Sequence, residues 1–417
     1  MQGRVAARLA PHSEEIEVSV HSVDAERRPH SLSSAAAPFA HGDDRALRLV
    51  QMSHARLVAL LHDARVDHVL PGALGAVCIG AAGSHAGAAE RMLADTVPDL
   101  PVAPVQMALL GADAAAADAV CEIWQCDAHD LRSERQGALH YRYSEAAGLV
   151  FGSIVVHETD AQHDGSTPLE RATFDAYRAL FDLLDTLGMP HPLRIWNTVP
   201  AINAVQFGIE RYRQFNIGRQ HAFDACRRAL TGGVPAACAL GSVVPVAGDA
   251  PPAAPLAIHF LASRTPADAV ENPRQVSAYH YPAQYGPRAP TFARAAAWAD
   301  DDAAPVLFVS GTASIVGHRT VHHGDVVAQA RETVANLAAV LEQAARQGHG
   351  SFSLADLSYR VYVRDAGDAA AIAGIGRVLR EAAGPRVRPL FVHADVCRDD
   401  LLVEIEASAG HAMEWLS

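Results

Sequence analysis

Residues 305–315 read Pro-Val-Leu-Phe-Val-Ser-Gly-Thr-Ala-Ser-Ile, and a polar loop and a helical pattern from Asp325 to about Ala345 follow them. The apolar run has the length and composition of one β-strand. In the helical pattern, apolar residues recur at steps of three and four, which places one apolar stripe on one helix face. These stripe residues are Val326, Ala330, Val334, Leu337 and Leu341. Asp325 is a typical N-cap, and glycines follow the end of the helix.

The chain continues with a strand pattern at 354–363, a helix at 369–383, a strand at 388–394 and a closing strand at 401–407. The same order occurs earlier in the chain, beginning at residue 148 where the later copy begins at 305, a separation of about one domain. The earlier copy has strands at 148–156, 192–199, 234–241 and 255–261 and helices at 169–187 and 209–230. Each copy therefore predicts two helices on one face of a mixed sheet.

We predict an α+β fold with mixed sheets and helices on one face of each sheet. The expected domains are a partly structured N-terminal region at 1–138, a first domain at 139–265, a bridging loop segment at 266–304 and a second domain at 305–417. Both ends of the bridging segment fall where the repeat pattern breaks.

The charged residues exclude several classes of function. The 417 residues carry a net charge of −13, and all 34 basic residues are arginines. A lysine Schiff base and a Walker-type phosphate loop are therefore excluded, and the acidic balance disfavours nucleic acid as a partner. Six cysteines without a CxxC pair favour reduced thiols in a cytoplasmic protein. We expect no membrane segment, because no apolar stretch is long enough to span a bilayer.

Two segments are dense in polar side chains. Residues 194–219 hold Arg194, Arg211, Arg213 and Arg219, which in an acidic chain indicate an anion site, since guanidinium groups bind carboxylates with paired donors. The alternative is that each arginine lies on a solvated helix face or in an internal ion pair. Residues 271–288 hold three tyrosines and three prolines, which suit either a binding loop for an organic acid or a rigid linker.

Several titratable residues are more simply interpreted as having no role in a site. His318, His322 and His323 match no metal-ligand spacing, so we expect no metal. Glu404 and Glu406 share one face of the closing strand, opposite Val403 and Ile405; they could be acids in a cleft or lie on an outward face, and we expect the outward face. Glu332 lies off the apolar stripe of its helix and, by itself, is a solvated glutamate.

The second copy resembles the Rid/YjgF family in Val309-Ser-Gly311, in residues 324–336 and in Leu402-Val-Glu-Ile-Glu-Ala407. That family forms trimers with ligand sites between neighbouring sheets. Its imine deaminases hold a carboxylate with an arginine at a place where this chain has Pro389, so a deaminase is a weaker alternative. From about Leu139 onward the chain resembles the chorismatases, which are built from Rid-like halves. The strings that carry this resemblance are 194–203, 210–219, 271–284 and 310–332.

The resemblance implies two Rid/YjgF-like (chorismate mutase-like) lobes in a pseudo-trimer-like arrangement, with a cleft between the copies. It implies Glu332 as the catalytic acid, on the first helix of the second copy. Carboxylate clamps are expected from Arg142, Tyr212, Arg219 and Tyr279, and a pocket-size role from Gly241. No cofactor and no metal are expected, and the expected state is a monomer or a small homo-oligomer.

The implied substrate is chorismate, whose enolpyruvyl vinyl ether is protonated on carbon by a carboxylic acid. The expected products are pyruvate and 3-hydroxybenzoate, with 4-hydroxybenzoate also made by some members of the family. Two alternatives remain at this stage. One is a chorismate hydrolase that gives a dihydroxycyclohexadiene carboxylate and pyruvate, and the other is a non-catalytic Rid-like protein that binds a small carboxylate.

Overall fold

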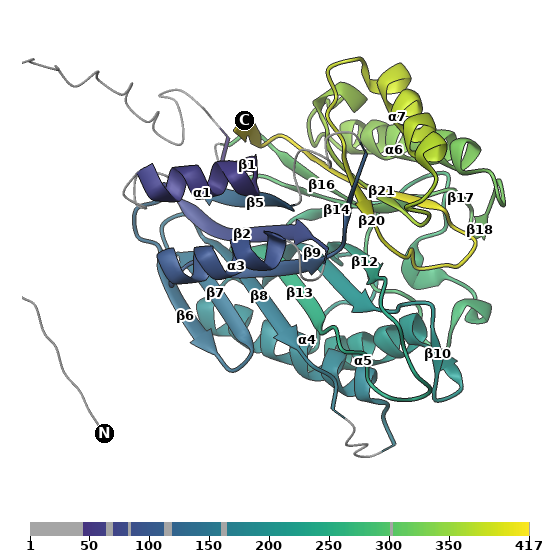
Figure 1. Ribbon diagram of the computed structural model, residues 1–417, viewed down its shortest axis with the longest axis horizontal. Coiled ribbons are helices and arrows are strands. Elements are labelled where there is room, and N and C mark those ends of the chain that lie inside the picture. The colour runs from purple at the N-terminus through teal and green to yellow at the C-terminus, as the bar shows by residue number, and fades with distance from the viewer. Residues whose placement is uncertain are drawn as a thin grey trace, which may run out of the picture. The chain divides into compact units, whose positions relative to one another are not determined.

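The computed structural model describes residues 45–63, 70–81, 85–111, 119–159, 165–300 and 303–416. Residues 1–44 of the predicted N-terminal region lie outside these ranges. The described chain forms three large β-sheets, each with a pair of helices packed on one face (Figure 1). We refer to the three sheets with their helices as the N-terminal, middle and C-terminal lobes.

The middle lobe has the strand order β12-β9-β13-β8-β7-β6. Its strands are β6 (Arg132–Gln136), β7 (Leu139–Ser144), β8 (Leu149–Val156), β9 (His191–Pro200), β12 (Ala236–Ser242) and β13 (Leu256–Ser263), and its helices are α4 (Pro168–Leu187) and α5 (Arg211–Ala225). Helix α5 begins later than predicted, because a small hairpin of β10 (Val205–Gln206) and β11 (Ile209–Glu210) precedes it.

The C-terminal lobe has the order β14-β15-β16-β21-β19-β20-β4. Its elements are β4 (Leu109–Leu110), β14 (Asp268–Val270), β15 (Ala295–Trp298), β16 (Val306–Ala313), α6 (Val326–Arg346), β19 (Ser358–Val363), α7 (Ala369–Ala383), β20 (Leu390–His393) and β21 (Val403–Ala409). A small hairpin of β17 (Ile315–Val316) and β18 (Arg319–Thr320) follows β16. As predicted, Asp325 caps α6 by accepting a hydrogen bond from the Ala328 amide. Parts of the predicted bridging segment thus join this sheet as β14 and β15.

The N-terminal lobe has the order β22-β1-β5-β2-β3. Its elements are β1 (Leu47–Ser53), α1 (His54–Asp63), β2 (Ala73–Gly80), α3 (His85–Thr96), β3 (Val102–Gln106), β5 (Ala119–Cys126) and β22 (Ala412–Leu416). Strand β22, from the end of the chain, pairs in parallel with β1. Residues 412–416 therefore lie in the N-terminal lobe, although the sequence assigned them to the second domain.

All three lobes share one strand order. The series β22-β1-β5-β2-β3 corresponds to β7-β8-β13-β9-β12 in the middle lobe and to β15-β16-β21-β19-β20 in the C-terminal lobe. The predicted α+β fold and pseudo-trimer-like arrangement are confirmed, and the N-terminal region supplies the third lobe. The third copy was not found as a sequence repeat because it is not contiguous in the chain: its edge strand β22 comes from residues 412–416, whereas its other strands lie before residue 127.

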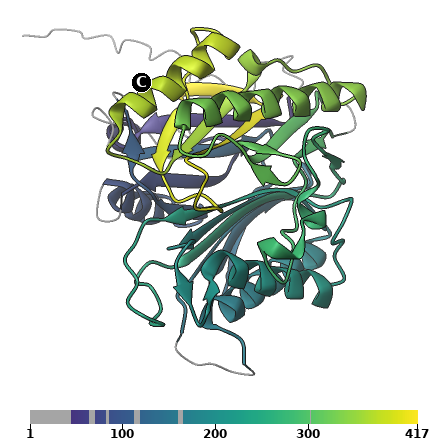
Figure 2. The same cartoon turned by 90° about the vertical axis from the view of Figure 1, so that its right-hand side faces the viewer.

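The inner faces of the three sheets meet in one central core, and the helices lie on the outer faces (Figure 2). That core takes Trp124 from the N-terminal lobe, Phe151 and Trp196 from the middle lobe, and Phe308 and Tyr362 from the C-terminal lobe. Each outer face buries its own pair of helices in a separate apolar cluster. The central strands of each sheet are thus buried on both faces, while the edge strands β6 and β22 are largely exposed, so polar side chains on an inner face can lie inside the protein.

Candidate active site

A cavity of about 950 Å³ lies between the middle and C-terminal lobes. Its middle-lobe wall comes from β12, the start of α5 and the turn before it, and includes Asn203, Glu210, Tyr212, Arg213, Arg219 and Cys238. Its C-terminal wall comes from β16, β21 and the loop before β21, and includes Gly311, Cys397, Arg398 and Glu404. The segment that joins the two lobes adds Tyr281, Tyr285 and Arg294. The volume suits a small organic ligand.

Glu404 is the carboxyl group at the base of this cavity. It is only 4% exposed and lies on β21, paired with Ala313 of β16, and its carboxyl group extends over Gly311, where an added Cβ would clash with Glu404 Oε1. The Cys397 thiol lies 3.8 Å from Glu404 Oε2. Burial, and then the charge of Glu406, raise the pKa of Glu404 to about 8, against the lowering effect of Arg194. Glu404 therefore holds a proton near neutral pH, in a place where a ligand reaches it.

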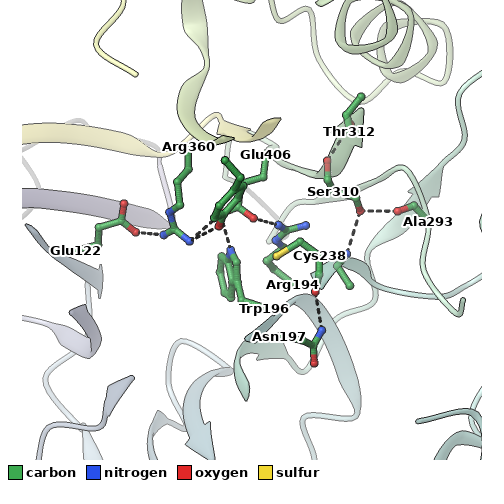
Figure 3. A network of polar contacts seen from close by, with 12 residues as sticks. Glu122, Arg194, Trp196, Asn197, Cys238, Ala293, Ser310, Thr312, Arg360 and Glu406 are labelled. Atoms are coloured by element: carbon green, nitrogen blue, oxygen red, sulfur yellow. Dashed lines mark hydrogen bonds and ion pairs between the residues drawn. The ribbon is translucent and has the colours of Figure 1, made fainter. Parts of the chain in front are cut away.

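Glu406 is the centre of a buried charge network that joins all three lobes (Figure 3). Its carboxylate pairs with Arg194 of the middle lobe and accepts hydrogen bonds from Trp196 Nε1 at 3.2 Å and the Tyr362 hydroxyl at 3.0 Å. Arg360 Nη1 lies 2.8 Å from the same carboxylate and, through Nη2, pairs with Glu122 of the N-terminal lobe.

Although burial opposes ionisation of Glu406, Arg360 and Arg194 hold its pKa below the usual range. Two glutamates on one strand face thus take opposite states, a fixed carboxylate at 406 and a protonated acid at 404. The expectation that this face points outward is wrong, because the inner face of β21 packs against the other two lobes.

Four cavity arginines carry buried nitrogens without a hydrogen-bond acceptor among the described residues, namely Arg213 Nε, Arg219 Nε, Arg294 Nε and Arg398 Nη2. Of these, Arg213 Nε lies 3.4 Å from Glu210 Oε2 in an ion pair. Arg219 is 2% exposed and donates through Nη2 to Asn216 Oδ1 at 2.8 Å. The Arg398 guanidinium lies 4.0 Å from the ring centre of Tyr285 and 5.1 Å from that of Tyr281. Buried donors without acceptors are costly, so these groups favour an anionic ligand that completes their hydrogen bonds.

Tyr212 and Arg219 are the predicted binding residues that the structure brings to the cavity. Both lie on α5, Tyr212 in its first turn and Arg219 two turns further along, and burial raises the pKa of the Tyr212 hydroxyl. Arg194 and Arg211, from the same polar segment, instead serve as internal ion pairs with Glu406 and Glu158. Of the arginines in this segment, Arg219 thus lies in the candidate anion site, whereas Arg194 and Arg211 form internal ion pairs, the two interpretations that the sequence left open.

Glu332 does not line the cavity. Its Oε1 accepts a hydrogen bond from Arg274 Nη2 at 2.6 Å, and His322 Nε2 lies 3.3 Å from its Oε2. The ion pair lies in the second turn of α6, and none of Arg274, His322 and Glu332 belongs to the residues that line the cavity. The structure therefore does not bring the predicted acid to the predicted cleft.

Arg142, Tyr279 and Gly241 also lie outside the cavity lining. Arg142 is on β7, which the three strands β9, β13 and β8 separate from the β12 wall of the cavity. Tyr279 contacts the His280 ring, and Tyr281 and Tyr285 of the same segment face the cavity instead. A Cβ at Gly241 would lie 2.5 Å from Ile202 Cγ2 and 2.7 Å from Asp395 Cβ, so this glycine permits close contact between two segments of the chain.

Sequence reasoning missed Arg294 and Arg398 as site residues, and it preferred an outward position for Glu404 to the alternative of an acid in a cleft. Alternation along β21 placed Glu404 and Glu406 on one face, but no pattern distinguishes a solvated face from one that another lobe covers. Among the described residues, no three His, Cys, Asp or Glu side chains form a group that could hold a metal ion. Within the same residues, no helix is long and apolar enough to cross a membrane.

Comparisons with known proteins agree with this geometry. The family model described as chorismatase FkbO/Hyg5-like, N-terminal, matches residues 122–262. A 3-hydroxybenzoate synthase of Streptomyces hygroscopicus is 37% identical over 301 residues, which cover 70% of this chain and 81% of that protein. A chorismatase of Streptomyces rapamycinicus is 40% identical over 246 residues, covering 56% of this chain and 68% of that protein.

A crystal structure of a chorismatase superposes with a TM-score of 0.65 at 28% identity, covering 88% of this chain and 94% of that one. The chain therefore belongs to the chorismatase family. It is an enzyme of this type, and the resemblance that its sequence suggested is confirmed.

Proposed function

We propose that this enzyme cleaves chorismate into pyruvate and 3-hydroxybenzoate, with Glu404 as the acid. The observation that carries the proposal is the Glu404 carboxyl group, which burial keeps protonated near neutral pH in a cavity whose arginines have unsatisfied N–H groups. Chorismate carries two carboxylates and an acid-sensitive vinyl ether, so it needs both kinds of group in one place. Glu404 takes the role that the sequence assigned to Glu332.

The two carboxylates of chorismate are held by the guanidinium groups. Arg219 lies in the middle-lobe wall and Arg398 in the C-terminal wall, so together they define two anion positions on opposite sides of one ligand. Each is fixed before the ligand arrives, Arg219 by Asn216 and Arg398 by the Tyr285 ring. Such preorganisation limits the entropy lost on binding and orients the enol ether toward Glu404.

The reaction begins when Glu404 donates its proton to the terminal vinyl carbon, which gives an oxocarbenium ion and leaves a carboxylate at 404. Capture of that ion by the ring hydroxyl forms a cyclic ketal and releases the hydroxyl proton. Aromatisation then removes a ring proton and breaks the ring C–O bond of the former hydroxyl, and the ketal collapses to pyruvate and 3-hydroxybenzoate, whose phenol oxygen takes up the released hydroxyl proton. The ring proton lost on aromatisation returns to Glu404, so no other reactant is consumed. A positioned acid of this kind contributes about 10²–10⁴-fold to the rate.

Incubation of the purified protein with chorismate, followed by mass analysis of the products, tests this proposal. The expected result is pyruvate and a hydroxybenzoate in equal amounts, without incorporation of water. A dihydroxycyclohexadiene carboxylate, heavier by one water, would instead identify a hydrolase. Unchanged chorismate that nevertheless binds would identify a carboxylate-binding protein without catalysis and would overturn the proposal.

A further inference from the structure

Arg364, directly after β19, has a role that the proposed chemistry does not use. Its guanidinium donates to the loop 395–402, which carries the cavity residues Cys397 and Arg398. Nε donates to the Leu401 carbonyl at 2.9 Å, and Nη2 donates to the carbonyls of Val396 at 3.0 Å and Arg398 at 2.8 Å. Three backbone carbonyls of one short loop thus accept hydrogen bonds from the same guanidinium group.

The remaining nitrogen of Arg364 connects this loop to the opposite lobe. Nη1 donates to Asp395 Oδ1 at 2.7 Å and to Asn203 Oδ1 at 3.0 Å, and Asn203 belongs to the middle-lobe wall of the cavity. Asp395 also exchanges two backbone hydrogen bonds with Gly241 of β12, at 2.7 and 3.0 Å. Gly241 allows this approach because it has no side chain: a Cβ at this position would lie only 2.7 Å from Asp395 Cβ.

We propose that Arg364 is a positioning residue that fixes the loop 395–402 across the two lobes, and so sets the place of Arg398 for the substrate carboxylate. All five N–H donors of a guanidinium lie in one rigid plane, so they hold several acceptors at once in fixed directions. Arg398 in turn donates to the His318 carbonyl at 3.0 Å and stacks on Tyr285. Its position therefore depends on the loop backbone as well as on these contacts.

The inference rests on the proposed function for its kinetic readout, so the experiment adds a readout that does not depend on turnover. Arg364→Lys keeps the positive charge and removes most of the donors. The matched control is Arg228→Lys, because Arg228 donates to the carbonyls of Pro190 and Phe181 and pairs with Asp185, at positions that are not part of the cavity lining. Both arginines are similarly buried, at 19% and 16% side-chain exposure.

Arg364→Lys is expected to raise the KM for chorismate about tenfold or more, with kcat within about threefold of wild type. Because Arg364 acts through Arg398, the double variant with Arg398→Lys should show a KM little higher than Arg398→Lys alone. Arg228→Lys should leave KM unchanged. An unchanged KM in Arg364→Lys, or fully additive effects in the double variant, would overturn the proposal.

The second readout is the rate at which iodoacetamide alkylates Cys397, located by peptide mass spectrometry and referred to Cys226 in the same molecule. Arg364→Lys should accelerate the reaction at Cys397 alone, because Cys397 lies on the loop. If the wild-type protein leaves chorismate intact, the proposed function fails, while the alkylation rates still decide whether Arg364 orders the loop. Should Arg364→Lys fold poorly, Asp395→Asn weakens one of the same contacts, and a smaller change in the same two readouts is expected; no change would overturn the proposal.

Discussion

The charge of Glu406 should set the pH range in which the enzyme works. Only a protonated Glu404 donates, so kcat for chorismate should be constant at low pH and fall tenfold per unit above the pKa of about 8. Glu406→Gln removes the neighbouring negative charge and keeps the size of the side chain; its single amide oxygen still accepts hydrogen bonds, whereas its NH2 group cannot accept the one from Arg194. The pKa of Glu404 should then fall, because Arg194 and Arg294 still lower it and Glu406 no longer raises it.

The size of this shift follows from the strand geometry. Residues two apart on one strand face lie about 7 Å apart, at a rise of about 3.4 Å per residue. Two unit charges at about 7 Å and an effective dielectric constant of about 20 interact by about 2 kcal/mol, or between one and two pH units. The descending limb of kcat should therefore move from about pH 8 to roughly pH 6–7, and turnover at pH 8 should fall about five- to fiftyfold.

The assay is a pH–rate profile of chorismate consumption from pH 5 to pH 9.5, with thermal unfolding measured for each variant. Glu122→Gln is the matched control, because it removes a carboxylate from the same buried network without a direct effect on the pKa of Glu404. Its limb should stay near pH 8. If Glu406→Gln folds and its limb coincides with that of the wild type, the assignment of the titrating acid to Glu404 is refuted.

Three further predictions follow from the cavity geometry. Arg219→Lys should raise the KM for chorismate at least about tenfold, because a lysine ammonium cannot donate the two parallel hydrogen bonds with which a guanidinium binds a carboxylate. An unchanged KM would exclude Arg219 as a carboxylate-binding residue. Gly311→Ala should displace the Glu404 carboxyl by more than about 1 Å and change the ratio of products with and without an added water, as measured by mass, whereas Gly233→Ala, where the added Cβ meets nothing within 4 Å, should not. Unfolded Glu404 ionises near pH 4.5 and folded Glu404 near pH 8, so the stability that its proton contributes is full below about pH 4.5 and is lost as pH rises to about 8. Between pH 5 and pH 8, urea unfolding should therefore show a smaller loss of unfolding free energy for Glu404→Gln than for wild type, by about 3–4 kcal/mol, and equal losses would contradict the raised pKa.

The sequence predicted the repeated elements well because their signals are local. Period and caps locate α6, and alternation along the closing strand separates Val403 and Ile405 from Glu404 and Glu406. The direction of the glutamate face could not be predicted, because it depends on a sheet more than a hundred residues away in sequence. The same holds for the third lobe, whose edge strand β22 joins β1 from the other end of the chain.

The site was predicted in part. Tyr212 and Arg219 reach the cavity because they lie in the first turns of a helix that begins at the boundary between lobes. Glu332 lies on the expected helix, but Arg274 and His322 occupy its carboxyl group. Arg398 lies on a loop with no periodicity of its own, and only the packing of three sheets determines what it faces.

The most direct test of the central claim compares chorismate turnover by Glu404→Gln and Glu332→Gln at pH 7, under conditions where both variants are folded. Glutamine keeps the shape of each side chain and removes the transferable proton. The proposal predicts that kcat falls about 10²–10⁴-fold in Glu404→Gln and stays within about threefold of wild type in Glu332→Gln. The opposite ranking, with Glu404→Gln active and Glu332→Gln inactive, would contradict it.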